Sequence, residues 1–368
     1  MRLGYFAMPM HPAHRPWQET LREDHDAIVL ADQLGFHDAF IGEHLTDSYE
    51  NITNSMLFLA SLISSTSNVL LGTGTTNLSF QHPALVAANS AMFDHMSDGR
   101  FILGVSPGAL PSDAELLGVL DEDRNRMFVE AIDVILALWN GDAPYDFDKV
   151  DNRWKVSTGR TSVPELGLGA VRKPLQRPRP EIVGTVVAPF SKGVIAMGQR
   201  DFHPLSANFL LKDWLASHWA NYADGKALAG AEPAPEEWRV ARTIFVADDP
   251  KIAEEYGKRS AGGPYRFYYS QMVSKMKLGG RLNLFKRDPE APDSSVTIDG
   301  VLDELVLCGT PEQVAQQILE LREIAGNFGE IVYAGMDWVD PTLGRRSMEL
   351  MATEVMPIIN REIGAVAE

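Results

Sequence analysis

Residues 69–108 decide the fold of this chain, and they read VLLGTGTTNLSFQHPALVAANSAMFDHMSDGRFILGVSPG. Two short apolar runs, 69–75 and 101–105, flank a helical segment in which Pro83 stands in the first turn and Gly99 follows the end. Apolar runs of this length are typical of strands buried on both faces. A strand, a helix and a strand in this order predict parallel strands joined by a right-handed crossover, so chemistry is expected after the C-terminal ends of the strands.

The same alternation extends outward in both directions. Short apolar runs predict strands at residues 3–8, 38–42, 69–74, 101–105, 181–184, 204–208, 240–247 and 329–334. Helical spacing of apolar residues predicts helices at 17–34, 54–66, 83–97, 124–139 and 190–199, and Thr310 to Gln313 form a capping box before another. About eight strands that alternate with helices favour a closed (β/α)8 TIM barrel over an open doubly wound sheet, because no Gly-x-Gly-x-x-Gly turn follows the first strand.

Two segments lack any regular period. Residues 141–180 mix Gly, Pro and scattered aromatic residues, and residues 261–295 mix Gly, aromatic and basic residues. We expect the first to be an excursion over one end of the barrel and the second to be a lid, both as insertions at the C-terminal face; a disordered surface insertion is the alternative for the second. No linker or repeat divides the chain, so residues 1–368 are predicted to form a single domain.

The composition excludes several classes of function. The formal net charge of −17 disfavours binding to nucleic acid or to an anionic membrane, since both would repel the protein. Cys308 is the one cysteine, so a disulfide framework or a thiolate metal cluster within one chain is excluded, and a reducing, cytoplasmic location is expected. The sequence shows neither a signal-peptide pattern nor an apolar stretch of the ~20 residues that span a membrane.

Glu43 and His44 directly follow the second predicted strand, which places a carboxylate and an imidazole at the mouth of the barrel. A histidine titrates near pH 6.5 and can act there as a general base or as a donor to a developing oxyanion; a purely structural hydrogen bond is the alternative. His11 and His14 follow the first strand and suggest a metal site with Glu43 and His44. That hypothesis is weaker, because the later strands add only His203, whereas barrel metallohydrolases usually carry further histidine ligands there.

Small and polar residues follow three other strands. The third strand ends in Gly72-Thr73-Gly74-Thr75, where the backbone could take an unusual conformation against a ligand, and the fourth ends in Ser106-Pro107-Gly108, whose small residues let a flat ligand approach. The fifth strand is followed by Val187, Ala188 and Ser191 at an expected helix start, where backbone N–H groups and a hydroxyl could bind an anion. The alternative is that Ser191 only caps the helix.

These motifs together resemble the bacterial luciferase-like flavin monooxygenases, and the limonene and diketocamphane monooxygenase branch in particular. The resemblance rests, in matching order and spacing, on Gly42-Glu43-His44-Leu45-Thr46, Glu50-Asn51-Ile52, Gly72-Thr73-Gly74-Thr75, His82-Pro83, Asp98-Gly99-Arg100-Phe101 and Gly104-Val105-Ser106-Pro107-Gly108. It is strong over residues 1–140 and weaker over residues 173–208 and 307–321.

The resemblance implies a (β/α)8 barrel homodimer that binds reduced FMN, supplied by a separate NAD(P)H:flavin reductase, and uses O₂ as co-substrate. Oxygen would form a flavin C4a-peroxide, which an apolar pocket protects and directs to a small-molecule substrate. His44 matches the family's catalytic histidine. Thr75 falls in the segment under the isoalloxazine, often reached through a non-proline cis peptide, and Ser106 takes the place of luciferase's reactive cysteine. The residues that match the phosphate-binding turn are Val187, Ala188 and Ser191.

The chain departs from luciferase itself at Pro107, where luciferase has an arginine that helps to hold the flavin phosphate. Neutralisation of the phosphate must therefore come from elsewhere, and oxygenation of a ketone or terpene-like compound fits better than luciferase's aldehyde reaction. We expect residues 141–180 and 261–295 to line the substrate pocket. The remaining alternatives are a deazaflavin-dependent dehydrogenase of the same superfamily, a flavin-binding protein without turnover, and a metal-dependent hydrolase.

Overall fold

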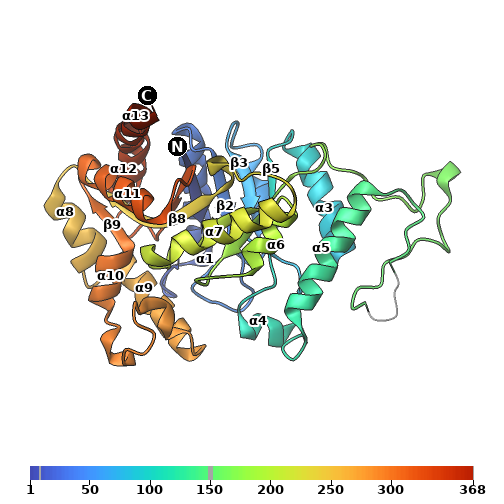
Figure 1. Cartoon of the computed structure of the whole chain (residues 1–368), viewed down its shortest axis with the longest axis horizontal. Coiled ribbons are helices and arrows are strands. Elements are labelled where there is room, and N and C mark those ends of the chain that lie inside the picture. The colour runs from blue at the N-terminus through green and yellow to red at the C-terminus, as the bar shows by residue number, and fades with distance from the viewer. Residues whose placement is uncertain (8–9, 148–151, 368) are drawn as a thin grey trace.

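The computed structural model of the chain is built around a closed barrel of eight parallel strands (Figure 1), and it describes residues 1–7, 10–147 and 152–367. The barrel strands are β1 (Arg2–Ala7), β2 (Asp38–Ile41), β3 (Leu70–Thr73), β5 (Phe101–Ser106), β6 (Glu181–Val186), β7 (His203–Ser206), β8 (Arg239–Val246) and β10 (Glu330–Ala334). β10 pairs with β1 on one side and with β8 on the other, which closes the barrel. The predicted TIM barrel is therefore confirmed; Met8, which ended the first predicted strand, lies outside the described residues.

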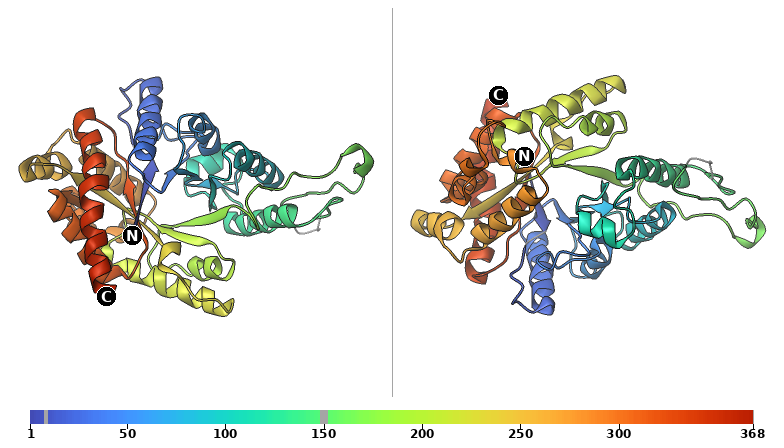
Figure 2. Two further views of the ribbon diagram at one scale, coloured as in Figure 1. Left: turned by 90° about the horizontal axis from the view of Figure 1, so that it is seen from above. Right: turned by 90° about the horizontal axis from the view of Figure 1, so that it is seen from below.

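Helices surround the barrel on its outside (Figure 2). They are α1 (Trp17–Gln33), α2 (Ser55–Leu62), α3 (Pro83–Met96), α5 (Arg124–Asn140), α6 (Gly193–Gln199), α7 (Lys212–Leu228), α11 (Pro311–Ala325), α12 (Pro341–Leu350) and α13 (Met356–Ala367). Local signals explain several starts: the Asn54 side chain accepts from the Leu57 N–H, and Thr310 and Gln313 form the predicted capping box. Within the described ranges, none of the helices combines the length and the apolar character that crossing a membrane requires.

Side chains fill the barrel in layers. The middle layer is apolar and consists of Phe40, Ile102, Val183, Leu205, Ala241 and Val332. Glycine permits close packing of two neighbouring strands, because a Cβ at Gly104 would lie 1.7 Å from the carbonyl oxygen of Thr73. The apolar layer separates a charged layer at the N-terminal ends of the strands from a pocket at their C-terminal ends.

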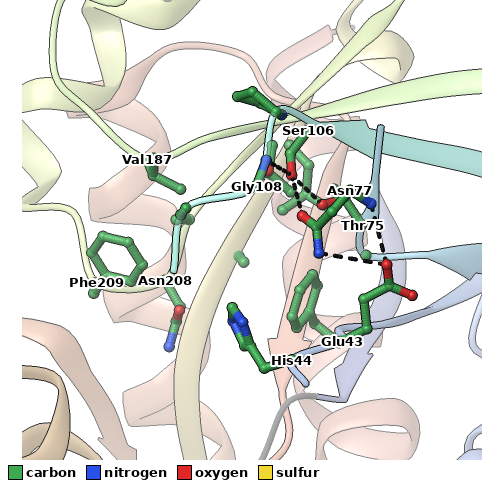
Figure 3. A pocket seen from close by; sticks show the side chains of 17 residues that line it. Glu43, His44, Thr75, Asn77, Ser106, Gly108, Val187, Asn208 and Phe209 are labelled. Carbon is green, nitrogen blue, oxygen red and sulfur yellow. Dashed lines mark hydrogen bonds between the residues drawn. The ribbon is translucent and has the colours of Figure 1, made fainter. Parts of the chain in front are cut away.

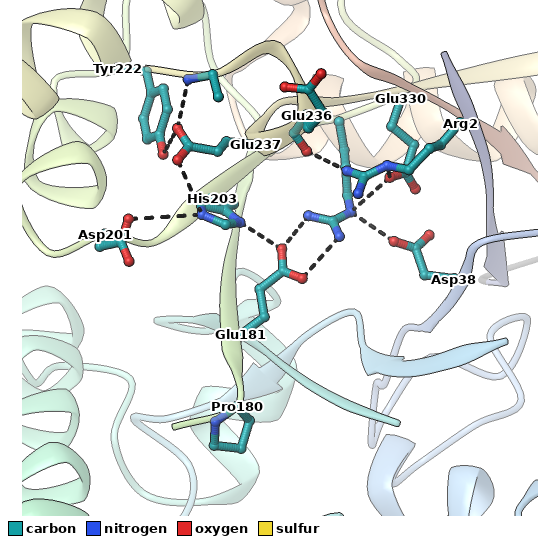
Figure 4. A network of polar contacts seen from close by, with 12 residues as sticks. Arg2, Asp38, Pro180, Glu181, Asp201, His203, Tyr222, Glu236, Glu237 and Glu330 are labelled. Carbon is teal, nitrogen blue, oxygen red and sulfur yellow. Dashed lines mark hydrogen bonds and ion pairs between the residues drawn. The ribbon is translucent and has the colours of Figure 1, made fainter. Parts of the chain in front are cut away.

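Buried ion pairs close the N-terminal end of the barrel (Figure 4). Arg239, whose side chain is buried, donates to Asp38 at 2.8 Å and to Glu181 at 2.5 Å. Burial alone would raise the pKa of Glu181, but the charges of Arg239 and His203 outweigh burial and lower it. Neither carboxylate oxygen of Glu330 has a hydrogen-bond partner among the described residues, and burial together with the charge of Asp38 raises the pKa of Glu330 well above its usual value.

Two strands lie off the path of the barrel, and neither was predicted. β9 (Val306–Gly309) pairs with β8 from Thr243 to Val246, beyond the residues that pair with β7, Arg239 and Val240. The length of β8 allows both pairings. β4 (Thr76–Asn77) is a short strand that pairs with β5 beyond the end of β3.

Residues 261–295, which showed no regular period in the sequence, contain a helix. Between α8 (Pro250–Glu254) and α10 (Ile298–Leu305), the first half of this segment forms α9 (Pro264–Leu278). The residues buried along one face of α9 at helical spacing include Tyr265, Tyr268, Tyr269 and Met272. Most of them are tyrosines, whose polar hydroxyls conceal the apolar period in the sequence. α9 lies at the same end of the molecule as α4 (Pro111–Leu116) (Figure 1).

The segment 141–180 enters and leaves the fold at the other end of the barrel from the one predicted. It connects the end of α5 to the start of β6, and barrel helices run antiparallel to the strands, so both connections lie on the N-terminal side. The segment then projects sideways from the barrel (Figure 1). In its described part, residues 141–147 and 152–180, Trp154 donates to the carbonyl of Met127 on α5 at 3.0 Å.

Candidate active site

A pocket of about 190 Å³ opens at the C-terminal ends of the barrel strands (Figure 3). Its apolar lining includes Phe6, Pro107, Val187, Leu205, Ala207, Phe209 and Ala241, and its polar lining consists of Glu43, His44, Thr75, Asn77, Ser106, Thr185 and Asn208. Within the part of the chain that the structure describes, no lysine or arginine lines the pocket. The pocket therefore suits a flat, largely apolar ligand whose polar edge meets a few fixed groups.

One wall of the pocket is a chain of hydrogen bonds between β3, β4 and β5 (Figure 3). The peptide between Gly74 and Thr75 is cis, as the resemblance implied. The Thr75 hydroxyl donates to Ser106 Oγ at 2.7 Å, and the Ser106 hydroxyl donates to Asn77 Oδ1 at 2.8 Å. Because each hydroxyl is engaged in the wall, Thr75 and Ser106 present a rigid surface to the pocket.

Glu43 anchors the loop that follows β2. Its Oε2 accepts from the N–H and the hydroxyl of Ser55, at 2.9 and 2.8 Å, and its Oε1 lies 3.3 Å from Nε2 of Gln81. Burial raises the pKa of Glu43, although the hydrogen bonds from Ser55 oppose this. These bonds tie the loop to the start of α2, so Glu43 holds in place the residue that follows it, His44.

His44 lies between two carboxylates at the edge of the pocket. Its Nδ1 is 3.2 Å from Oδ2 of Asp113, and its Nε2 is 3.3 Å from Oε2 of Glu50. Burial alone would lower the pKa of His44, but the charges of Glu50 and Asp113 outweigh burial and raise the pKa above its usual 6.5. The two carboxylates therefore shift the balance toward the charged imidazolium, whose two ring nitrogens are both donors.

Asp113 reaches His44 from the first turn of α4. Its second oxygen, Oδ1, accepts from the N–H of Thr46 at 2.8 Å and from the Thr46 hydroxyl at 2.5 Å. Burial would raise the pKa of Asp113, but hydrogen bonds from His44 and Thr46 lower it, so the carboxylate stays ionised. One carboxylate thus fixes both the imidazole and the backbone of the loop that carries it.

α9 adds a cation to this group of charges. Lys275 Nζ donates to Oε1 of Glu50 at 2.8 Å and also contacts Oδ2 of Asp47, so Glu50 is shared between His44 and Lys275. On the same helix, the Tyr268 hydroxyl accepts from the side-chain amide of the pocket residue Asn208 at 3.2 Å. α9 therefore braces two sides of the pocket from behind.

The predicted phosphate-binding turn reaches the pocket only in part. Val187 lines the pocket, whereas Ala188 and Ser191 do not. α6 begins at Gly193 with Lys192 as its N-cap, so the predicted helix start at residue 190 is wrong and Ser191 is not the cap. Of the residues that the resemblance assigned to catalysis or cofactor binding, the pocket brings together His44, Thr75, Ser106 and Val187.

The two inserted segments do not line the pocket, and that prediction is wrong. Among the described residues of 141–180 and 261–295, none contributes to the lining. The second segment contacts residues of the pocket lining from outside. It does so through α9 and through Arg281, whose Nη2 donates to the carbonyl oxygen of Val187 at 3.2 Å. Residues 207–209, directly after β7, provide the wall that the segments were expected to provide.

The metal site considered for the two histidines after β1 with Glu43–His44 is not formed. Among the described residues, the ligand atoms of His11, His14 and Glu43–His44 form no common group. His11 Nε2 instead lies 3.2 Å from Oδ1 of Asp24, and its Nδ1 contacts Asp337. Burial would lower the pKa of His11, but hydrogen bonds to Asp24 and Asp337 raise it to about 9. His11 thus forms buried ion pairs that hold the fold together, and it does not belong to the pocket.

Asp113 and Lys275 are site residues that the sequence did not reveal. Asp113 is 69 residues from His44, and Lys275 is 225 residues from Glu50, so neither pairing leaves a local pattern. An acidic residue in the first turn of a helix is ordinarily read as stabilising the helix, and a lysine as a surface residue. The one available signal was that Asp113 follows the fourth predicted strand, at the end of the barrel where chemistry was expected.

Comparisons with known proteins identify relatives along the whole chain. Residues 1–327 match the luciferase-like monooxygenase family. The chain is 30% identical to 4-hydroxyprotoasukamycin monooxygenase from Streptomyces nodosus subsp. asukaensis, over 99% of this chain and 93% of that protein. It is 27% identical to limonene 1,2-monooxygenase from Rhodococcus erythropolis, over 98% of this chain and 87% of that protein.

A solved structure with the same architecture is the oxygenating constituent of 3,6-diketocamphane monooxygenase from Pseudomonas putida, a type II Baeyer–Villiger monooxygenase determined in complex with FMN. It matches with a TM-score of 0.87 and 26% sequence identity, and 98% of each chain is covered. These findings confirm the resemblance that the sequence motifs indicated. The chain belongs to the luciferase-like monooxygenase family and is an oxidoreductase of that family.

Proposed function

We propose that this protein is the oxygenating component of a two-component, FMNH₂-dependent monooxygenase that acts on a small apolar ketone or terpene-like compound. One atom of O₂ would enter the substrate and the other would leave as water, with FMNH₂ supplying the two electrons. The observation that carries the proposal is the position of His44, between Glu50 and Asp113 at the edge of a largely apolar pocket. The FMN complex of the P. putida relative supports the choice of cofactor.

The residues of the pocket fit the ring system of FMN. Small residues, Gly74, Gly108, Ala207 and Ala241, leave room for a flat ring against the wall formed by Thr75. At about 190 Å³ the pocket is smaller than the roughly 300–1,000 Å³ typical of cofactor sites, so the ribityl phosphate tail would extend beyond it. When bound, reduced FMN supplies the electrons that activate O₂.

The chain's own residues would orient the reactants, exclude water and hold a proton. Thr75 and Ser106 would support the ring. Oε2 of Glu50 lies 3.3 Å from Nε2 of His44 but has no hydrogen-bond partner among the described residues, so Nε2 would be the atom that donates a hydrogen bond to oxygen on the cofactor or the substrate. Phe6 and Phe209 would bind an apolar substrate and keep water out.

Two partners complete the proposal. A separate NAD(P)H:flavin reductase would supply FMNH₂, because the first strand of this chain is not followed by a Gly-x-Gly-x-x-Gly dinucleotide turn. A homodimer is supported by large exposed apolar side chains on α2 and α3, namely Leu57, Leu85, Met92 and Met96. Light scattering of the purified protein measures this directly.

Anaerobic titration with reduced FMN and with a reduced deazaflavin coenzyme tests the cofactor. The proposal expects FMNH₂ to bind and the deazaflavin to bind much more weakly. Tighter binding of the deazaflavin than of FMNH₂ would contradict the proposal and favour a deazaflavin-dependent oxidoreductase instead. Turnover of cyclic ketones and terpenes under isotopically labelled O₂ is then expected to leave one labelled oxygen atom in the product; a product without label would contradict oxygenation.

A further inference from the structure

The charge of the proposed cofactor is not matched inside the pocket. A phosphate monoester carries a charge of about −1.5 to −2 near pH 7. None of the described residues that line the pocket is a lysine or an arginine, and the pocket is too small to hold the whole of FMN. If FMN binds here, as proposed above, its phosphate must lie beyond the lining, where a cation from a neighbouring element can reach it.

Arg281 is placed at such a position by the end of α9. Gly280 has a φ of 67°, a left-handed conformation that ends the helix, and the N–H of Arg281 donates back to the carbonyl of Met276 at 2.8 Å. The side chain then crosses to the turn after β6, where Nη2 donates to the carbonyl oxygen of Val187 at 3.2 Å. Since Val187 lines the pocket, the guanidinium is one residue away from the pocket lining.

The guanidinium of Arg281 is free to bind an anion. Among the described residues it has no carboxylate partner, and the one contact of its side chain uses a single N–H. A guanidinium offers five donors in a planar fork that matches two phosphate oxygens, so several donors stay available. The side chain is only partly buried, so an approaching ligand can reach it.

Two other cations near the pocket, Lys275 and Arg242, are less suited to this role. Lys275 is already paired with Asp47 and Glu50. Arg242 donates to the carbonyl of Ala241 at 3.2 Å, but it is fully buried, and burial lowers its pKa to about 10. Arg281 combines an unpaired charge with partial exposure and a contact to Val187, a residue of the pocket lining.

We propose that Arg281, which belongs to the segment that follows β8, binds the phosphate of FMN. It would supply the positive charge that the pocket lining lacks. The phosphate would accept from the guanidinium, beside the turn that starts at Val187. Bound FMN would then join the C-terminal end of α9 to the end of β6. Charge-assisted hydrogen bonds of this kind are roughly twice as strong as neutral ones.

The test compares FMN with riboflavin, which is the same flavin without the phosphate. Each is titrated, oxidised and anaerobically reduced, against the wild type, Arg281→Met, Arg281→Lys and the control Lys277→Met, which removes one exposed charge from the same segment. Arg281→Met is expected to weaken FMN binding at least about tenfold and to leave riboflavin binding unchanged; Arg281→Lys should recover part of the loss. Lys277→Met should alter neither. Retained riboflavin binding also shows that the variant is folded.

Three outcomes would overturn the inference. Equal weakening of both flavins would make Arg281 a structural residue, and unchanged binding of both would show that it does not meet the phosphate. If Arg242→Met selectively lost FMN binding and Arg281→Met did not, Arg242 on β8 would be the residue that neutralises the phosphate. If the wild type binds neither flavin in either redox state, the proposed function itself fails, and that result differs from each of the others.

Discussion

His44 has a carboxylate at each of its ring nitrogens, and this arrangement limits what the residue can do. Burial alone would lower the pKa of His44, but the two carboxylates raise it and so favour the protonated ring, which in the proposed function is a hydrogen-bond donor or an acid. The sequence left a general base and a donor equally open. The positions of Glu50 and Asp113, which favour the donor, depend on the folded structure.

His44→Ala is expected to lower the rate of oxygenation by about 10²-fold or more, the scale of general acid–base catalysis, while FMN binding and thermal unfolding stay close to the wild type. Steady-state turnover with a defined substrate and flavin titration measure the two effects separately. His14→Ala is the matched control, because His14 is an exposed histidine that does not line the pocket. Loss of flavin binding in His44→Ala, with turnover lost only in proportion, would make His44 a structural residue.

At the residue scale, positions in the sequence predicted which side chains lie together at the pocket, but not which hydrogen bonds and ion pairs they form. His44, Thr75, Ser106 and Val187 all follow parallel strands, and parallel strands bring their C-terminal ends together. Asp113 and Lys275 come from helices, and helices turn most of their polar residues to solvent. Which polar residue is turned inward depends on the packing angle of the helix, and that angle leaves no mark on a single sequence.

At the element scale, a residue of α9 influences the charge of His44 through Glu50. Lys275 binds Glu50, and Glu50 faces His44, so a change in either residue alters the field at the imidazole. The positive charge of Lys275 opposes the rise in the pKa of His44, whereas Glu50 is the largest contributor to that rise. The two residues should therefore move the pKa of His44 in opposite directions.

The pH dependence of turnover tests this coupling. If protonated His44 is the active form, activity falls as pH rises through the pKa of His44. Lys275→Met should move this fall to higher pH, Glu50→Gln should move it to lower pH, and Lys275→Arg should restore the wild-type profile. Lys277→Met is the control on the same helix. A uniform loss of activity in both variants, without a shift of the profile, would contradict the coupling.

Most elements could be predicted because their periodicity is simple. The barrel strands are continuous apolar runs, and the predicted helices carry apolar stripes. α9 was missed because most of its buried face is tyrosine, and β9 because a short run such as Val306 to Gly309 reads equally well as the end of the preceding helix. The path of residues 141–180 depends on long-range contacts such as that between Trp154 and Met127, which no local pattern encodes.

At the scale of the whole molecule, the barrel separates two polar ends with an apolar layer. The pocket end carries the candidate active site, and the opposite end carries the ion pairs of Arg239 with Asp38 and Glu181. The closed barrel followed from the alternation of strands and helices, whereas the charged layer did not. Its residues stand at the starts of strands, where a charged residue in a sequence is ordinarily assigned to the surface.

The charged layer gives a prediction for stability against pH. The pKa of Glu330 is higher in the folded protein than its usual 4.5, so its contribution is full at low pH and is lost as pH rises above that value. Glu330→Gln should remove this loss, and at pH 8 the variant should be at least as stable as the wild type. Glu181→Gln should instead destabilise by about 1.5–3 kcal/mol at pH 7, because it removes a charged partner of buried Arg239.

Urea unfolding of both variants between pH 5 and 9 measures these free energies. The comparison of the two variants is decisive, since both replace a glutamate of the same layer by glutamine. If Glu330→Gln were destabilised at pH 8 as strongly as Glu181→Gln, Glu330 would be an ionised member of the network, and its role in the pH dependence would be wrong.

The most direct test of oxygenation is stopped-flow absorbance after the protein, loaded anaerobically with FMNH₂, is mixed with oxygenated buffer. We predict a transient whose absorbance differs from that of reduced and of oxidised FMN, which persists for much longer than free FMNH₂ survives in oxygen and decays faster when substrate is present. Immediate appearance of oxidised FMN at the rate of free flavin, with or without substrate, would contradict a monooxygenase that uses FMNH₂.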